Sequence, residues 1–390
     1  MKSLESLTRR DAKKIITALR EGKPPTDYVE YFSIGRGQLL EYFDGKLAEI
    51  RDFDLADVKF VSADWGHGKT HFLDLIRQLA HKHNFVTAMV QLHSRNAPFD
   101  KLEVVVQNMM RSISTSEYKD NGLEYILEDW AEKQKGKTQH QILRELRPLP
   151  FPDMRMKLAD YARCFNAQQH GQCIQILKWF RGEETPSKTF KDVKEFLHSF
   201  TCFVRLIGYS GFVVMLDEAE AITSLSRIQK RDLANENIRQ IIDNDRDSEG
   251  FYFVFASTSS FFDLDESRGA SSYPALWRRI SDLSGIKQES LEKVIVGLPR
   301  LSEQEFFELA SKIKSIFEIA EDVTLPQVND DYLRLLAHYV QTRTDQRVGT
   351  LVRSTVALLQ EACQEEFDFL RNYEFVVGRT IQDESRDRTR

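Results

Sequence analysis

Residues 63–70, ADWGHGKT, form a glycine-bearing turn between two stretches of different periodicity. The segment before it, 58–63, is rich in valine and phenylalanine and is typical of a β-strand. The segment after it, 71–81, carries apolar residues at helical spacing. A glycine turn that leaves a strand and opens a helix is the setting of a phosphate-binding loop. These residues therefore predict an α/β protein that binds a nucleotide.

The residue types of this turn suit the binding of ATP. Gly66 and Gly68 let backbone N–H groups turn toward phosphate oxygens, because neither residue has a Cβ in the way. We expect Lys69 to reach the β- and γ-phosphates and Thr70 to offer its hydroxyl to Mg²⁺. The helix that follows directs its positive N-terminus at the same anion.

Three other positions of the segment complete the prediction. His67 and His71 flank the Gly-Lys-Thr core, and we include both among the expected nucleotide-binding residues. Ala63 stands where the pattern GxxxxGK[ST] has its first glycine. A methyl group is tolerated at the end of a strand if φ stays negative, so this departure leaves the prediction in place. A chance glycine turn is the alternative, and the flanking strand and helix make it the weaker one.

A second apolar strand, predicted at 212–216, runs into an acidic pair. A buried strand that ends in acids puts them at the carboxyl edge of a parallel sheet, where ligands bind. We expect Asp217 to hold Mg²⁺ through water and Glu218 to act as general base toward the attacking water. Glu220 follows on the same turn, and we interpret it as a solvated or capping residue.

The remaining strands and helices suggest the architecture. Further strands are predicted at 85–92, 251–257 and 294–296, and their alternation with helices predicts a three-layer α/β/α parallel sheet. We place a nucleotide-binding core at 1–297, with an N-terminal helix and connector at 1–50 and a helical insertion at about 98–200. An all-helical lid follows at 298–378, with helices expected at 303–317, 330–339 and 347–370. Residues 379–390 are almost all polar and predict a frayed tail.

Composition excludes several classes of protein. Lys and Arg number 54 and Asp and Glu 60, and a net charge of -6 excludes a polybasic protein that binds nucleic acid over its whole surface. No apolar run reaches the ~18 residues needed to cross a bilayer, and the N-terminus lacks the apolar region of a secretion signal. The four cysteines form no CxxC pair. We expect a cytoplasmic protein that does not act at a membrane.

Polar residues after the strand at 251–257 and before the last strand are further candidates. Thr258 could contact the γ-phosphate and the attacking water, or simply cap the next turn. Arg278 and Arg279 lie before the last strand, and a surface arginine pair is most often solvated.

These pieces together resemble the AAA+ ATPases, especially their initiator-like and STAND-like branches. Gly35 and Arg36 look like the N-terminal "GR" box that packs near adenine. Thr258 matches the sensor-1 position, and Arg279 matches the arginine that precedes the last strand and acts on a neighbouring subunit's nucleotide. Arg347 resembles the sensor-2 arginine, which contacts the bound nucleotide. The resemblance implies a homo-oligomeric ring or filament.

A closer resemblance is to the ATP-binding proteins of BREX phage-defence systems, the BrxD-like P-loop family. It is carried by YFxIGR at 31–36, DWGHGKTHF at 64–72 and LIGYSG at 206–211 running into LDEAE at 216–220. This resemblance implies a bacterial cytoplasmic ATPase with antiviral function, which accompanies helicase or other DNA-directed defence proteins. Double-stranded DNA is a candidate partner.

These residues agree with three functions to different degrees. An ATPase that switches or remodels a partner uses the complete set of hydrolytic residues. A nucleotide-gated, DNA-binding scaffold with negligible turnover is the alternative, although it would not need Glu218. A small-molecule kinase is disfavoured, because no acceptor motif is recognisable.

Overall fold

The structure is a computed structural model that describes residues 4–183, 192–244, 249–263, 267–281, 291–364 and 367–388. Its elements form two compact units, which we describe separately. The first comprises Met1–Leu40, Ala63–Leu75 and Gly297–Arg390, and the second comprises Glu41–Ser62 and Ile76–Val296. No helix among the described residues is both long enough and apolar enough to cross a membrane.

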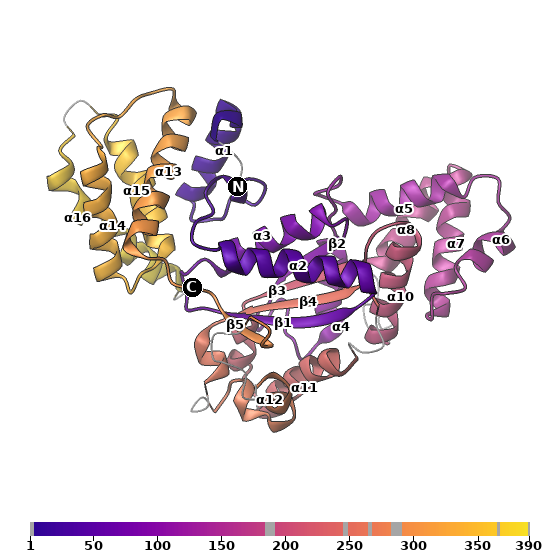
Figure 1. Cartoon of the computed structure of the whole chain (residues 1–390). Helices are drawn as coiled ribbons and strands as arrows, with labels where there is room; N and C mark the ends of the chain where they lie inside the picture. Colours follow the sequence, from indigo (N-terminus) through magenta and orange to yellow (C-terminus); the bar gives the residue numbers. More distant parts are fainter. Residues whose placement is uncertain are drawn as a thin grey trace. The chain divides into compact units, whose positions relative to one another are not determined.

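The sheet belongs to the second unit, apart from the last residue of β5 (Figure 1). Its strands lie in the order β2-β3-β4-β1-β5, and the pairs β2–β3, β3–β4 and β4–β1 are parallel. Ser62 lies opposite Ser257, and Leu216 lies opposite Phe255. The carboxyl ends of β1, β3 and β4 therefore share one edge, as the sequence predicted. The strands are β1 (Ala56–Ser62), β2 (Val86–Gln91), β3 (Phe212–Asp217), β4 (Phe251–Ser257) and β5 (Ile295–Gly297).

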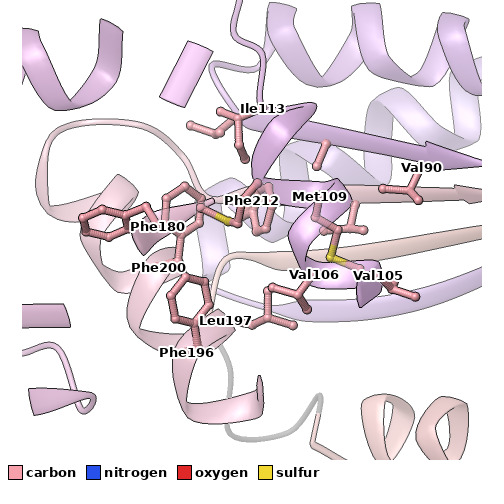
Figure 2. Close-up of a cluster of buried hydrophobic side chains, with 14 of the residues drawn as sticks. Val90, Val105, Val106, Met109, Ile113, Phe180, Phe196, Leu197, Phe200 and Phe212 are labelled. Atoms are coloured by element: carbon pink, nitrogen blue, oxygen red, sulfur yellow. The ribbon is translucent and has the colours of Figure 1, made fainter. Parts of the chain in front are cut away.

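Helices cover both faces of this sheet, which confirms the predicted three-layer α/β/α arrangement (Figure 1). On one face, Phe212 packs among side chains of α4 and α10, including Met109 and Phe200 (Figure 2). On the other face, Phe43 of α2 contacts Tyr252 of β4, with ring centroids 6.1 Å apart. The helices around the sheet are α2 (Gly37–Phe53), α3 (Lys69–Lys82), α4 (Leu102–Arg111), α10 (Val193–Leu206), α11 (Ile228–Asn244) and α12 (Pro274–Ile280).

The long segment between β2 and β3 is mostly helical among the residues that the structure describes, as the sequence indicated. Between α4 and α10 lie α5 (Gly122–Lys133), α6 (Gln139–Glu145), α7 (Pro152–Asn166) and α8 (His170–Phe180). Two of these helices start at positions that the sequence marks: Thr138 and Gln141 form a capping box at the start of α6, and Pro152 opens α7.

The glycines at the entry to β3 have a structural role. Gly211 has a φ of +151°, and Gly208 has a φ of +108°. A Cβ on Gly211 would overlap the carbonyl oxygen of Gly250, and it would lie 2.8 Å from the carbonyl carbon. That carbonyl accepts the N–H of Phe212 at 2.8 Å and cannot easily move. The GYSG string at 208–211 therefore shapes the start of a buried strand.

Gly211→Ala should accordingly lower the free energy of unfolding by roughly 2–5 kcal/mol, because backbone strain adds to a backbone clash. Gly208→Ala is the matched control, since its Cβ would meet no heavy atom within 4 Å and only the strain of roughly 1–3 kcal/mol applies. Denaturant unfolding measures both. If both variants lost the same free energy of unfolding, the overlap of the added Cβ with the Gly250 carbonyl would cost nothing after the backbone adjusts, and the expectation for Gly211→Ala would be wrong.

The first unit contains α1 (Arg9–Arg20) and the helices of the C-terminal region. Two expectations for that region are wrong. The helix predicted at 347–370 is two helices, α15 and α16, and the tail predicted to fray continues α16 as far as Arg388. Buried polar pairs hold this polar segment in place: Thr350 donates to Glu384 at 2.8 Å, and Ser354 donates to Thr380 at 3.3 Å. The helices are α13 (Glu303–Glu321), α14 (Asp330–Arg343), α15 (Val348–Glu361) and α16 (Phe369–Arg388).

Candidate nucleotide-binding site

The glycine turn has the backbone of an anion-binding loop. It follows β1 directly in the sequence and leads into α3, which begins at Lys69. Gly66 and Gly68 have φ values of +83° and +89°, in the left-handed region that side chains disfavour. A Cβ added to Gly68 would meet no protein atom within 4 Å, so there is open space in front of this residue. The loop can therefore take a phosphate group there.

Lys69 is buried and folds back over the loop. Its Nζ donates to the carbonyl oxygen of Ala63 at 2.9 Å and to that of Asp64 at 3.5 Å. Thr70 follows it in the first turn of α3. A lysine ammonium, a glycine turn and a helix N-terminus together provide the positive groups that a triphosphate with Mg²⁺ requires.

Gly35 and Arg36, the GR box, pack against the glycine turn at 63–70 and against the segment that follows β5. The Arg36 guanidinium is buried, and it donates to the carbonyl oxygen of His67 at 3.3 Å and to that of Pro299. Burial lowers the pKa of Arg36 to about 10, and it remains charged at pH 7. Gly35 has a φ of +68°, and a Cβ there would lie 2.6 Å from Glu305 Oε1. The positive φ favours glycine here, and a Cβ would also displace the ends of the Leu301 and Glu305 side chains.

His71 lies beside the same box. Its ring centroid is 5.1 Å from that of Phe32, with the planes tilted by 37°. Burial, with a smaller effect from the nearby Arg36, lowers the pKa of His71 to about 4. The imidazole is therefore neutral at pH 7, and the two rings form an uncharged aromatic pair next to the start of α3.

The turn between α14 and α15 contacts the phosphate loop from the lid side. His67 Nε2 donates to the carbonyl oxygen of Asp345 at 3.0 Å, and the N–H of Gly349 donates to the carbonyl oxygen of Gly66 at 3.2 Å. Arg347 is the residue that precedes α15, and a Cβ added to Gly66 would lie 3.3 Å from its Cγ. The structure thus brings the predicted residues Gly66, His67 and Arg347 together.

Sequence reasoning missed one arginine of this site. Arg300 Nη1 donates to Asp345 Oδ1 at 3.0 Å, and its Nη2 lies 3.4 Å from Asp64 Oδ2. It therefore bridges the phosphate loop and the α14–α15 turn. Its position in the sequence, two residues after Leu298, does not distinguish it from a solvated arginine.

The acidic pair and Thr258 lie together at the carboxyl edge of the sheet, in the second unit. Asp217 is buried at the end of β3, and its Oδ1 accepts the N–H of Glu218 at 2.9 Å. Glu218 has a φ of +56°, an unusual value for a residue with a side chain and one found often at functional sites. Thr258 follows β4, and its hydroxyl lies 3.0 Å from that of Ser260.

Arg279 has protein partners on its own helix, α12, and on the preceding helix, α11. Its Nη2 donates to Asp243 Oδ2 of α11 at 2.8 Å, and its Nη1 donates to the carbonyl oxygen of Ala275 at 2.7 Å. Arg278 is exposed and makes no ion pair within the described part of the chain. An arginine of this pair that acts on another molecule would have to be Arg278, or Arg279 after it releases Asp243.

Comparison with known proteins gives one family and several distant structures. The family model for the BREX system ATP-binding protein BrxC/D matches residues 7–366. Domain III of the Thermotoga maritima replication initiation protein DnaA is similar at 14% identity and a TM-score of 0.43, with 90% of this chain and 96% of that chain covered. The Aeropyrum pernix ORC1 protein in complex with DNA is similar at 14% identity and a TM-score of 0.46, with 96% and 70% covered. Among curated proteins, none matches the chain.

Proposed function

Because the chain belongs to the family of BREX system ATP-binding proteins BrxC/D, we propose that it binds ATP at the phosphate loop and hydrolyses it as an AAA+ ATPase. The observation that carries this proposal is the loop itself. Two left-handed glycines, open space before Gly68 and the buried Lys69 occur together at the start of α3. Such a cluster of backbone and side-chain donors suits a polyphosphate.

We assign the following roles. The loop from Gly66 to Lys69 binds the phosphates, and Thr70 with Asp217 holds Mg²⁺, which neutralises charge on the phosphate oxygens when bound. Glu218 accepts a proton from the attacking water, and Thr258 orients that water. The aromatic pair of Phe32 and His71, with Gly35 and Arg36, faces the adenine. Arg347, whose side chain lies beside Gly66, contacts the nucleotide from the lid.

Membership of this family supports a proposal for the cellular role. We propose a bacterial cytoplasmic protein in which ATP turnover switches or remodels a partner within a DNA-directed antiphage system, in a homo-oligomeric ring or filament. Steady-state phosphate release with and without double-stranded DNA tests this proposal. Turnover that DNA changes supports an active remodeller, whereas tight ATP binding with negligible release in both conditions supports the nucleotide-gated scaffold.

Lys69→Ala should weaken ATP binding roughly 10–100-fold, the effect of losing hydrogen bonds from a charged group. Lys82→Ala, at the other end of α3, is the matched control: Lys82 is exposed and lies 3.3 Å from Asp44. It should bind ATP like the unmodified protein. Titration with a fluorescent ATP analogue measures both affinities. Unchanged affinity in Lys69→Ala would remove the assignment of the loop.

A further inference from the structure

Glu220 connects the acidic turn after β3 to the end of β4. One carboxylate oxygen, Oε2, accepts the hydroxyl of Ser257 at 3.1 Å and the backbone N–H of Thr258 at 3.2 Å. Ser257 is fully buried, and Glu220 is half-buried. Of the two interpretations that the sequence suggested, a solvated or a capping residue, the solvated one is therefore not what the structure shows.

These two hydrogen bonds extend the contact between the strands beyond their paired residues. The register of β3 and β4 runs to Leu216 opposite Phe255. Past that pair, β3 continues into the acidic turn and β4 continues into Thr258. The Glu220 carboxylate joins the two continuations at the sheet edge where Glu218 and Thr258 lie.

The turn that carries Glu220 is itself held closely. The N–H of Glu218 donates to Asp217 Oδ1 at 2.9 Å, and the N–H of Ala221 donates to the carbonyl oxygen of Glu218 at 2.9 Å. The hydroxyl of Thr223 donates to the carbonyl oxygen of Glu220 at 2.8 Å. Because Glu220 is fixed on this turn, its bonds to β4 set the position of Thr258 relative to Glu218.

We infer that Glu220 is a positioning residue, which holds the end of β4 so that Thr258 stays in place beside the general base Glu218. The expected effect on turnover rests on the proposed ATPase function. The role of Glu220 in holding Thr258 at the end of β4 does not depend on that function. It also assigns different chemistry to two glutamates of one turn. Glu218 must take up a proton, whereas Glu220 acts by accepting hydrogen bonds from Ser257 and Thr258.

Glutamine separates these two kinds of chemistry. The carbonyl oxygen of a glutamine side chain can accept both hydrogen bonds that Oε2 accepts, but it cannot act as a base. Glu220→Gln should therefore keep kcat within about threefold of the unmodified protein. Glu220→Ala should lower kcat roughly 10–100-fold, the scale of a misplaced catalytic group, while the Kd for ATP stays within about threefold. Ser257→Ala removes one of the two hydrogen bonds to Glu220, and its kcat should lie between those of Glu220→Gln and Glu220→Ala.

Hydrogen–deuterium exchange of the peptide covering 257–262, measured without nucleotide, tests the inference independently of turnover. Glu220→Ala should speed exchange of the Thr258 amide at least tenfold, because its acceptor is gone, and Glu220→Gln should not. Unchanged exchange in Glu220→Ala would overturn the inference. The inference would also be overturned if Glu220→Gln hydrolysed ATP as slowly as Glu220→Ala, because the charge of the carboxylate would then be required. Absence of turnover in the unmodified protein would instead refute the proposed function, and the exchange result would still decide this inference.

Discussion

Glu218→Gln should bind ATP nearly as well as the unmodified protein and hydrolyse it roughly 10²–10⁴-fold more slowly, the range for loss of a general base. Glutamine has the size of glutamate, and it can keep the left-handed backbone at this position, where φ is +56°. Its N–H can still donate to Asp217 Oδ1. The substitution therefore removes the ability to accept a proton and changes little else.

Single-turnover hydrolysis together with an ATP titration measures the two parts of this expectation. Glu220→Gln is the matched control, because it makes the same chemical change two residues further along the same turn. Turnover that persists within a few-fold in Glu218→Gln would show that the base lies elsewhere, and Glu220 would then be the next candidate.

Arg279→Ala should bind ATP but hydrolyse it poorly, with a loss on the scale of about 10³–10⁵ in rate that applies to arginines acting on a neighbouring subunit's γ-phosphate. A head-to-tail contact of this kind must close into a ring or run into a filament. Mixing Arg279→Ala with Lys69→Ala should therefore restore part of the activity. One variant supplies an intact phosphate loop, and the other supplies the arginine. Phosphate release from the mixture, compared with each variant alone, measures this effect.

The ion pair between Arg279 and Asp243 supplies the control. If Arg279 only ties α12 to α11, Asp243→Ala should impair hydrolysis as much as Arg279→Ala does. If Arg279 acts on a neighbour's nucleotide, Asp243→Ala keeps the guanidinium and should retain most of the activity. Arg278→Ala tests the adjacent, exposed arginine in the same assay. A mixture that stays inactive although both proteins co-assemble would refute the role of Arg279 in a neighbouring subunit.

Several features of the protein could be predicted from the sequence because they depend on neighbours in the chain. The loop at 63–70 combines its glycines, lysine and threonine within one turn, and its flanking periodicities identify the strand and the helix. The run from Phe212 to Glu218 predicts both a buried strand and its acidic end. Alternation of strands and helices then indicates a parallel sheet, which the structure confirms.

The contacts that organise the site could not be predicted in this way, since they join residues far apart in the chain. Arg300 contacts Asp64 and Asp345, and nothing near it in the sequence distinguishes it from a solvated arginine. The polar segment at the C-terminus resembles a frayed tail until Thr350 is seen to donate to Glu384. Glu220 is one acid among several at the end of β3, and only the parallel pairing of β3 with β4 brings it to Ser257. The sequence by itself therefore determined the glycine turn, the strand and helix on either side of it and the acidic end of β3, because these patterns are local. The tertiary structure decided which distant groups contact them, because hydrogen bonds and ion pairs depend on distance in space.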